Sequence, residues 1–147
     1  MINSIELVNF ISHFDTKLEF DNNTSVFIGK NGAGKSTIID GITFALFGEH
    51  TRGTNRALLK RGTNQGYTKV EFSANGKNYQ ALRKINSKGE LVLAQLSENI
   101  DGNLRIIVEG ELTKFGESMS KDLEKFLVLI LRNYRLHQLF NKINSVQ

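Results

Sequence analysis

The residues best suited to chemistry lie at positions 29–36, which read GKNGAGKS. They match G-x-x-x-x-G-K-[ST] at every fixed position. The glycines allow a tight turn that brings backbone N–H groups close to phosphate oxygens. Lys35 adds an ammonium for the β- and γ-phosphates, Ser36 offers a hydroxyl to Mg²⁺, and Thr37 adds a hydroxyl nearer the α-phosphate. The pattern predicts a nucleotide-phosphate site, and the alternative is a plain glycine turn between a strand and a helix.

The segments on either side of the loop are those that such a site requires. A short apolar run at 24–28 predicts a buried strand before the loop. Apolar residues recur at helical spacing after it, at Ile38, Ile39, Ile42, Ala45 and Leu46. Gly48 stands where this helix would end. The helix N-terminus would aim its amides and its dipole at the same anion as the glycine loop.

The remaining pattern predicts strands followed by a helical tail. Strands are expected at 1–10, 15–20, around 70–72, 79–85, 91–96 and 104–110. Asn75-Gly76 and Asp101-Gly102 are hairpin turn signals, and 87–89 is a further turn. From about Ser120 helical spacing returns, and the tail either packs in the core or forms a face that another lobe or a second copy would cover. The predicted class is α/β, with a mixed sheet, an antiparallel meander and a C-terminal helical segment.

Composition narrows the classes of protein to consider. A chain of 147 residues with 39% apolar content predicts one globular domain. The N-terminus lacks a basic leader followed by a long apolar stretch, and no run reaches the length of a membrane helix, so we expect neither secretion nor a membrane partner. The chain has no cysteine, which excludes disulfides and thiolate metal sites. These features indicate the cytoplasm.

The surroundings of the loop resemble one family. "LVNFISHFDTKLEF", "FIGKNGAGKSTIIDGITFALFG" and "TRG" are similar to the N-terminal lobe of the SMC-like DNA repair ATPases, the SbcC and Rad-fifty proteins, a branch of the ABC ATPases. The resemblance is specific over 1–85, weak over 86–125 and lost beyond. It implies a P-loop NTPase fold of the ABC/SMC type, with 1–147 forming a single nucleotide-binding lobe, half of an ATPase head.

The resemblance also implies a site that binds ATP and Mg²⁺. By position, the loop residues that wrap the phosphates include Asn31, Gly32, Ala33 and Gly34, while Lys35 neutralises them and Ser36 holds Mg²⁺. Ser12 and His13 are placed beside the nucleotide. A surface histidine after a strand is the alternative for His13. Family members often carry a basic residue where this chain has Ile11, so that phosphate contact is missing.

The partners implied by the family lie outside this lobe. A C-terminal ATPase lobe, on the same or a separate chain, supplies carboxylates and a serine-glycine signature, and a coiled coil joins the lobes. Two heads close over two ATP molecules as a homodimer, and closure regulates DNA binding and a calcineurin-like nuclease of the SbcD or Mre-eleven type. The predicted function is DNA double-strand-break repair, in the nucleoid-associated cytoplasm or the nucleus. The alternatives are a non-catalytic nucleotide-binding or dimerisation fragment, or the N-lobe of another SMC-like chromosome or recombination ATPase.

Several parts of a complete ATPase are not found in this sequence. "LRIIVEGE" at 104–111 comes nearest to a magnesium-aspartate strand, but its hairpin context argues against that role. There is no serine-glycine-glycine signature and no sustained heptad run. The family's magnesium-sensing glutamine corresponds to Gln138, to Gln147 or to neither, and the sequence does not choose among these three. We therefore expect the chain alone to bind ATP and to hydrolyse it poorly.

Basic residues gather in two segments after the predicted helix. They are Arg52, Arg56, Lys60 and Arg61 in the first, and Arg83, Lys84 and Lys88 in the second. The steps from 52 to 56 to 60 would align if that segment were helical, and such a row could follow the phosphate backbone of DNA. The alternative is a solvated loop with balancing charges, and the net charge of +4 is compatible with both.

Overall fold

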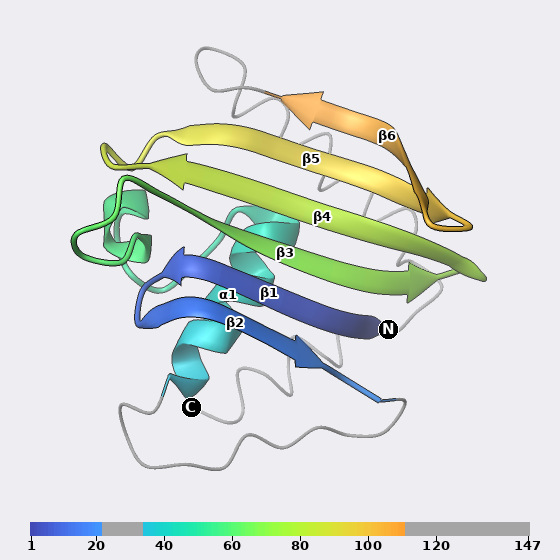
Figure 1. Ribbon diagram of the computed structural model, residues 1–147, viewed down its shortest axis with the longest axis horizontal. Coiled ribbons are helices and arrows are strands. Elements are labelled where there is room, and N and C mark those ends of the chain that lie inside the picture. The colour runs from blue at the N-terminus through green and yellow to red at the C-terminus, as the bar shows by residue number, and fades with distance from the viewer. Residues whose placement is uncertain (22–33, 111–147) are drawn as a thin grey trace.

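The computed structural model describes residues 1–21 and 34–110. Its elements are, in chain order, β1 Ile2–Phe10, β2 His13–Glu19, α1 Lys35–Phe47, the short 3₁₀ helix η1 Asn55–Leu58, β3 Gln65–Ala74, β4 Lys77–Asn86, β5 Leu91–Ile100 and β6 Asn103–Gly110. The strands form one sheet in the order β2-β1-β3-β4-β5-β6 (Figure 1). Every pairing among them is antiparallel. The predicted antiparallel meander is therefore confirmed.

The hairpin turns form where the sequence predicted them. Asn75 and Gly76 both have positive φ, 52° and 73°, and so do Asp101 and Gly102, 52° and 87°. Left-handed backbone at both central residues is the requirement of the two-residue turn that matches strand twist. β6 is the second strand of the hairpin at Asp101-Gly102, which agrees with the argument against a magnesium-binding strand at 104–111.

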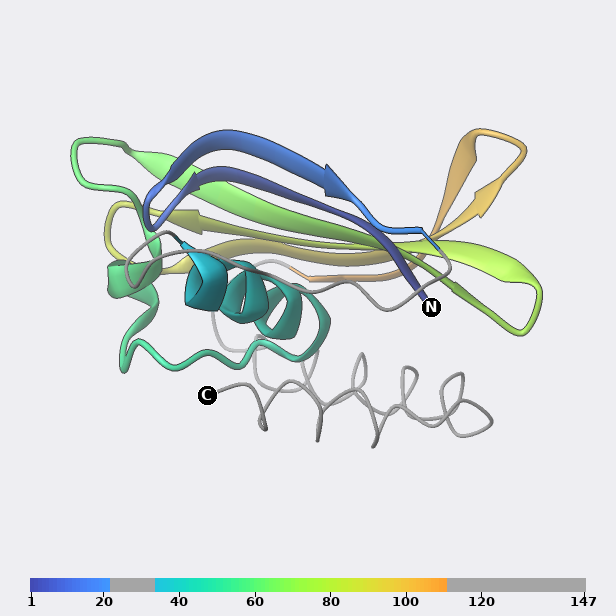
Figure 2. The same cartoon turned by 90° about the horizontal axis from the view of Figure 1, so that it is seen from below.

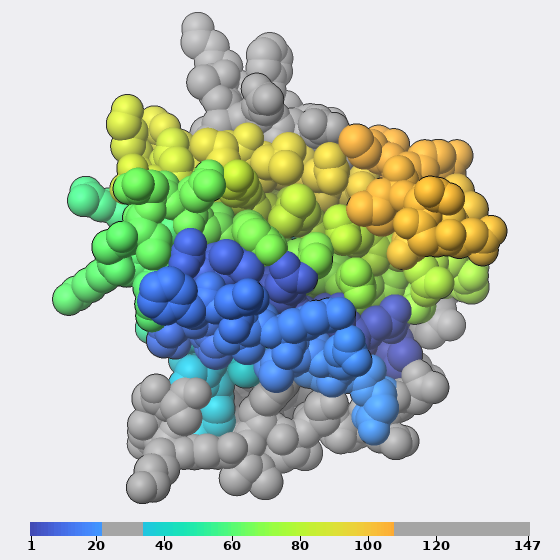
Figure 3. All heavy atoms as spheres, viewed as in Figure 1, coloured from blue at the N-terminus to red at the C-terminus, as the bar shows by residue number. Residues whose placement is uncertain are grey.

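One face of the sheet packs against α1, and no described element covers the opposite, open face (Figure 2). Residues that alternate along the strands point toward α1 and are buried, among them Ile5, Leu7, Val70, Ala81 and Leu96. The side chains on the other face are visible in the space-filling view (Figure 3). There Lys69 forms an ion pair with Glu6 across β1 and β3, and the Tyr67 hydroxyl donates a hydrogen bond to the same carboxylate. The open face is thus polar and internally paired at its centre.

A glycine sets the distance between α1 and the sheet. A Cβ added to Gly41 would lie 2.6 Å from Leu7 Cδ2 and 3.1 Å from Ile5 Cδ1. Thr68 on β3 donates its hydroxyl to the Gly41 carbonyl at 2.9 Å. Because only a residue without a side chain permits this approach, the helix lies directly on β1 and β3.

Arg83 is part of the core and does not belong to a basic surface. The alternation of β4 turns it toward α1, where it is 1% exposed, and its Nε donates to the Ala45 carbonyl at 3.2 Å. Burial lowers the pKa of Arg83 to about 10. Gly48 ends α1 with φ 75°, and a Cβ there would meet Arg83 Nη1 at 3.2 Å. Arg83 therefore does not belong with Lys84 and Lys88 in a basic surface segment, because its side chain binds the C-terminal end of the helix.

Several predictions fall on other parts of the chain. The strand at 24–28, the loop residues Asn31, Gly32 and Ala33, the helical tail from Ser120, and both Gln138 and Gln147 lie outside the described residues. Within residues 1–21 and 34–110, no helix has the length and apolar character needed to cross a membrane.

Candidate nucleotide-binding site

The turn between β1 and β2 has an unusual backbone that the surrounding structure holds in place. Asn9 and Ile11 both have φ of 51°, the left-handed region, and for a β-branched residue such as Ile11 this is a true outlier. The amide of Ile11 donates to the Leu58 carbonyl at 2.8 Å, and the amide of Lys60 donates to the Asn9 carbonyl at 2.9 Å. Strained backbone of this kind concentrates at functional sites, where it fixes the residues that follow.

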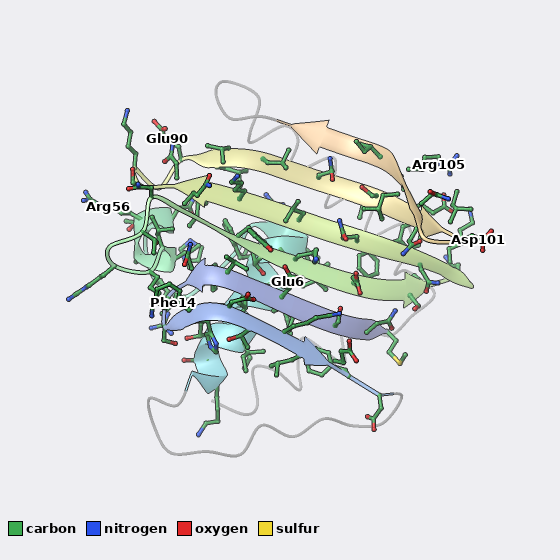
Figure 4. All side chains as sticks on the ribbon, viewed as in Figure 1. Glu6, Phe14, Arg56, Glu90, Asp101 and Arg105 are labelled. Atoms are coloured by element: carbon green, nitrogen blue, oxygen red, sulfur yellow. The ribbon has the colours of Figure 1, made fainter. Side chains whose placement is uncertain are left out.

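The side chain of Lys60 also binds the β1–β2 turn. Its Nζ donates to the Ser12 carbonyl at 3.0 Å and lies 4.9 Å from the ring centre of Phe14, a cation–π contact. Phe14 is 68% exposed and lies at the end of the sheet where η1 packs (Figure 4). Lys60 therefore positions the turn that carries Ser12 and His13.

His13 meets the glycine that starts α1. Its Nδ1 forms a hydrogen bond of 2.9 Å with Thr16 Oγ1. Its Nε2 is shielded from solvent and has no hydrogen-bond partner among the described residues, and a Cβ added to Gly34 would lie 2.9 Å from it. The same Cβ would lie 3.6 Å from Ser12 Oγ. The partial burial of this imidazole does not fit the surface-histidine alternative, because the β1–β2 turn presses it against the helix start.

The N-terminal end of α1 is electrostatically suited to an anion. Gly34 caps the helix with φ 87°, no acidic residue lies in the first turn, and Lys35 is its first residue. The first N–H groups of a helix have no partner within the helix, and together with the helix dipole they place positive potential at this end. Ser36 is exposed there, whereas Thr37 is only 2% exposed. The start of α1 thus carries a lysine and an exposed serine at the positive end of the helix dipole.

A buried carboxylate organises the chain after α1. Asp40 is 1% exposed and accepts hydrogen bonds from the Thr51 amide at 2.8 Å and the Thr51 hydroxyl at 2.9 Å. Arg52 pairs with the same carboxylate through Nε at 2.9 Å, and its Nη2 donates to Ser36 Oγ at 3.2 Å. The contacts satisfy a carboxylate that would otherwise be costly to bury. Asp40 thereby connects the 51–52 segment to the start of the helix.

The structure places Ser12 and His13 beside Gly34, and Lys35 and Ser36 follow Gly34 in the chain. Thr37 follows them but is turned into the protein. Sequence reasoning missed the roles of Asp40, Thr51 and Arg52. The available signal was a carboxylate on the inner side of an otherwise apolar helix, which requires a partner.

The row of basic residues that a helix over this segment would have produced is not formed. Only Asn55–Leu58 is helical in this segment, as a 3₁₀ helix, so the residues at 52, 56 and 60 do not share one α-helical face. Arg52 is paired with Asp40, and Lys60 binds the β1–β2 turn. Arg56 remains exposed, at the end of the sheet near Glu90 (Figure 4).

The fold is that of the P-loop ATPase heads of SMC and RecF proteins, as two solved structures show. An SMC ATPase structure from work on the "ATP-driven dimerization and DNA stimulated activation of SMC ATPases" matches with a TM-score of 0.59 and 17% identity, over 88% of this chain and 79% of that chain. The recombination mediator protein RecF matches with a TM-score of 0.60 and 21% identity, over 71% of this chain and 28% of that chain.

The family is shown by sequence comparison. The model of the AAA domain family matches residues 4–146. Two DNA double-strand break repair Rad50 ATPases are similar: that of Sulfolobus acidocaldarius is 41% identical over 67% of this chain, and that of Thermoplasma acidophilum is 32% identical over 97%. The chain belongs to this AAA domain family, as the N-terminal lobe of an SMC-like ATPase of the Rad50/SbcC type. The expected loss of resemblance beyond residue 125 is wrong, because the family match continues to 146.

The chain spans only a small part of these relatives. The matched part amounts to 11% of the Sulfolobus acidocaldarius protein and 15% of the Thermoplasma acidophilum protein. The DNA replication and repair protein RecF of Clostridium botulinum is 28% identical over 99% of this chain and 48% of its own length.

Proposed function

We propose that this chain is the nucleotide-binding half of an ATPase head that acts in DNA double-strand-break repair. The observation that carries the proposal is the meeting of the β1–β2 turn with the start of α1. His13 Nε2, shielded from solvent, lies against Gly34, and Lys35 and Ser36 follow directly. An unpaired imidazole nitrogen beside a helix N-terminus without acidic residues fits a ligand that is both anionic and able to form hydrogen bonds.

The residues present fit Mg²⁺-ATP. Lys35 would bind the β- and γ-phosphates, the amides at the start of α1 would bind phosphate oxygens, and Ser36 would give its hydroxyl to Mg²⁺. Bound Mg²⁺ supplies charge neutralisation and orients the phosphates. Ser12 and His13 would line the nucleotide from the β1–β2 turn. Asn31, Gly32, Ala33 and Thr37 remain predicted contributors.

The rest of the catalytic site would come from a C-terminal lobe. We expect two heads to close over two ATP molecules, with closure controlling access to DNA and to a calcineurin-like nuclease. Support comes from similar proteins that are DNA double-strand break repair Rad50 ATPases, and from a similar SMC ATPase structure from work on ATP-driven dimerisation and DNA-stimulated activation. On this proposal 1–147 forms one lobe that binds ATP and turns it over slowly by itself.

A second candidate function is recombination. It is favoured by the similarity to the Clostridium botulinum RecF protein, which extends over 99% of this chain. The two candidates differ in their partners. Co-purification with a metallophosphoesterase-type nuclease would support the repair assignment, and its absence from a complex that contains other recombination proteins would support the second.

The deciding experiment measures Mg²⁺-ATP binding by calorimetry and phosphate release on the same sample. Binding without turnover is expected for the chain alone, and added C-terminal lobe should restore turnover. Robust turnover by the chain alone would contradict the divided site. Tight binding with no turnover after the C-terminal lobe is added would instead identify a non-catalytic nucleotide-binding module.

A further inference from the structure

A series of contacts runs from the buried carboxylate of Asp40 to the hydroxyl of Ser36. Arg52 makes both links, with Nε 2.9 Å from Asp40 Oδ2 and Nη2 3.2 Å from Ser36 Oγ. We propose that Arg52 and Mg²⁺ compete for the Ser36 hydroxyl, so that Arg52 sets how much Mg²⁺ the nucleotide site requires. The inference rests on the proposed function, in which Ser36 is a magnesium ligand.

Competition follows from the distances and charges. Mg²⁺ binds oxygen at about 2.0–2.1 Å and demands near-octahedral geometry. An ion on Ser36 Oγ would therefore lie within about 5 Å of a guanidinium nitrogen that is 3.2 Å from the same oxygen. Both cations draw on one small set of lone pairs, and like charges so close repel each other. A full Mg²⁺ shell and the Arg52 bond to Ser36 are thus poorly compatible.

Asp40 makes the exchange reversible. Its carboxylate is held by Thr51, through the backbone amide and the hydroxyl, and it retains Arg52 through Nε. The guanidinium can therefore turn its Nη2 away from Ser36 without losing its anchor. Its side chain is 34% exposed, which leaves room for that rotation. Arg52 acts as a positioning residue that yields to the metal and returns when the metal leaves.

The test is a Mg²⁺ titration of fluorescent ATP-analogue binding to the full 147-residue chain. In Arg52→Gln the Mg²⁺ concentration for half-maximal binding should fall by about threefold or more, because a neutral side chain no longer opposes the ion. Arg52→Lys should show a smaller fall, since an ammonium held by Asp40 lacks the planar fork that also reaches Ser36 but keeps the positive charge near the ion. It should also keep more of the thermal stability than Arg52→Gln. Arg56→Gln removes the same charge from exposed η1 and should leave the Mg²⁺ requirement unchanged.

The outcomes separate this inference from the proposed function. An unchanged Mg²⁺ requirement in Arg52→Gln, with nucleotide binding intact, overturns the inference alone. Weaker nucleotide binding in the absence of Mg²⁺ overturns it too, since Arg52 would then be a phosphate ligand. No binding by the unmutated chain overturns the proposed function itself. A double-mutant cycle of Arg52→Gln and Ser36→Ala in thermal unfolding tests the contact without nucleotide, and additive effects would contradict it.

Discussion

An arginine contacts each end of α1, and the two arginines differ in almost every physical respect. At the C-terminal end Arg83 is 1% exposed and donates to a carbonyl of the last turn. At the N-terminal end Arg52 has a side chain that is 34% exposed and donates to a side-chain hydroxyl. The C-terminal end of a helix attracts cations, whereas the N-terminal end repels them.

The position of Arg52 at the N-terminal end of α1 accounts for the carboxylate that holds it. The helix dipole stabilises the charge of Arg83, which also makes a cation–π contact with Phe44, its guanidinium carbon 5.9 Å from the ring centre. Arg52 stands where the dipole opposes it, and Asp40 compensates. The helix dipole stabilises Arg83 in the core. It opposes Arg52, which is held mainly by the Asp40 carboxylate and is therefore easier to displace. The stable end of α1 and its reactive end are distinguished in this way.

The largest expected effect is at the reactive end. Lys35→Ala should weaken Mg²⁺-ATP binding by about 100-fold or more, since a charge-assisted contact to phosphate is lost. The free energy of unfolding should change by less than about 0.5 kcal/mol, because Lys35 is not in the core. Calorimetry and urea unfolding measure the two quantities. Lys88→Ala in the β4–β5 turn is the control, and equal ATP affinity in both variants would refute the phosphate site.

At the stable end the effects should be reversed. Arg83→Ala should lower the free energy of unfolding by about 3 kcal/mol, through a cavity and an unsatisfied Ala45 carbonyl. ATP affinity measured on the folded fraction should stay within about twofold, a change below about 0.5 kcal/mol. Urea unfolding followed by circular dichroism gives the stability. The contrast between the two ends would be refuted if Arg83→Ala kept the free energy of unfolding of the unmutated chain but lost its affinity for ATP.

A smaller effect is expected from a substitution that should increase ATP affinity at the reactive, N-terminal end of α1. Ile11→Arg supplies the basic residue that this chain lacks and removes a β-branched side chain from φ 51°. Affinity for ATP should rise by about threefold to tenfold, the value of one partly solvated charged contact. Ile11→Asn relieves the backbone without adding charge, and it should not raise the affinity. A gain in both variants would attribute the effect to backbone relief.

The smallest effect concerns the open face of the sheet, remote from both helix ends. The hydrogen bond from Tyr67 to Glu6 raises the pKa of Tyr67 to about 12, from an ordinary value of 10.0. The fold favours the neutral phenol, so its contribution to stability is complete below pH 10.0 and is lost as the pH rises toward 12. Between these pH values the midpoint temperature of thermal unfolding should therefore fall more steeply with pH in the unmutated chain than in Tyr67→Phe. Equal slopes of unfolding temperature against pH in the two chains would contradict the stabilising role of the hydrogen bond from Tyr67 to Glu6.

Features that depend on neighbouring residues could be predicted from the sequence. The turn at Asn75-Gly76 follows from the backbone angles that those two residues tolerate, and Gly48 ends α1 for the same reason. The phosphate motif was found because its spacing is fixed by one loop and one helix turn. The position of Arg83 could also have been found, since it shares a strand face with Ala81 and Ile85, and both of these are buried.

The site could be predicted only in part, because its remaining contacts join distant segments. Asp40 and Arg52 meet because the chain reverses after Gly48, and no periodic pattern encodes that reversal. The same holds for Lys60, which reaches Ser12 across the end of the sheet. Charge alone suggested a row of basic residues, but ion pairs and cation–π contacts depend on tertiary packing.

The arrangement of β1 and β3 has a consequence for the order of folding. β3 to β6 are joined by short turns, whereas β1 pairs with β3 across the whole segment that carries α1, as in the pairing of Ile5 with Val70. Closing that long loop costs more entropy than forming a hairpin and is slower. In refolding we expect the four-stranded meander to form first and the ability to bind phosphate to arrive with the final phase. A chain arrested before that step would possess most of its sheet and no nucleotide site.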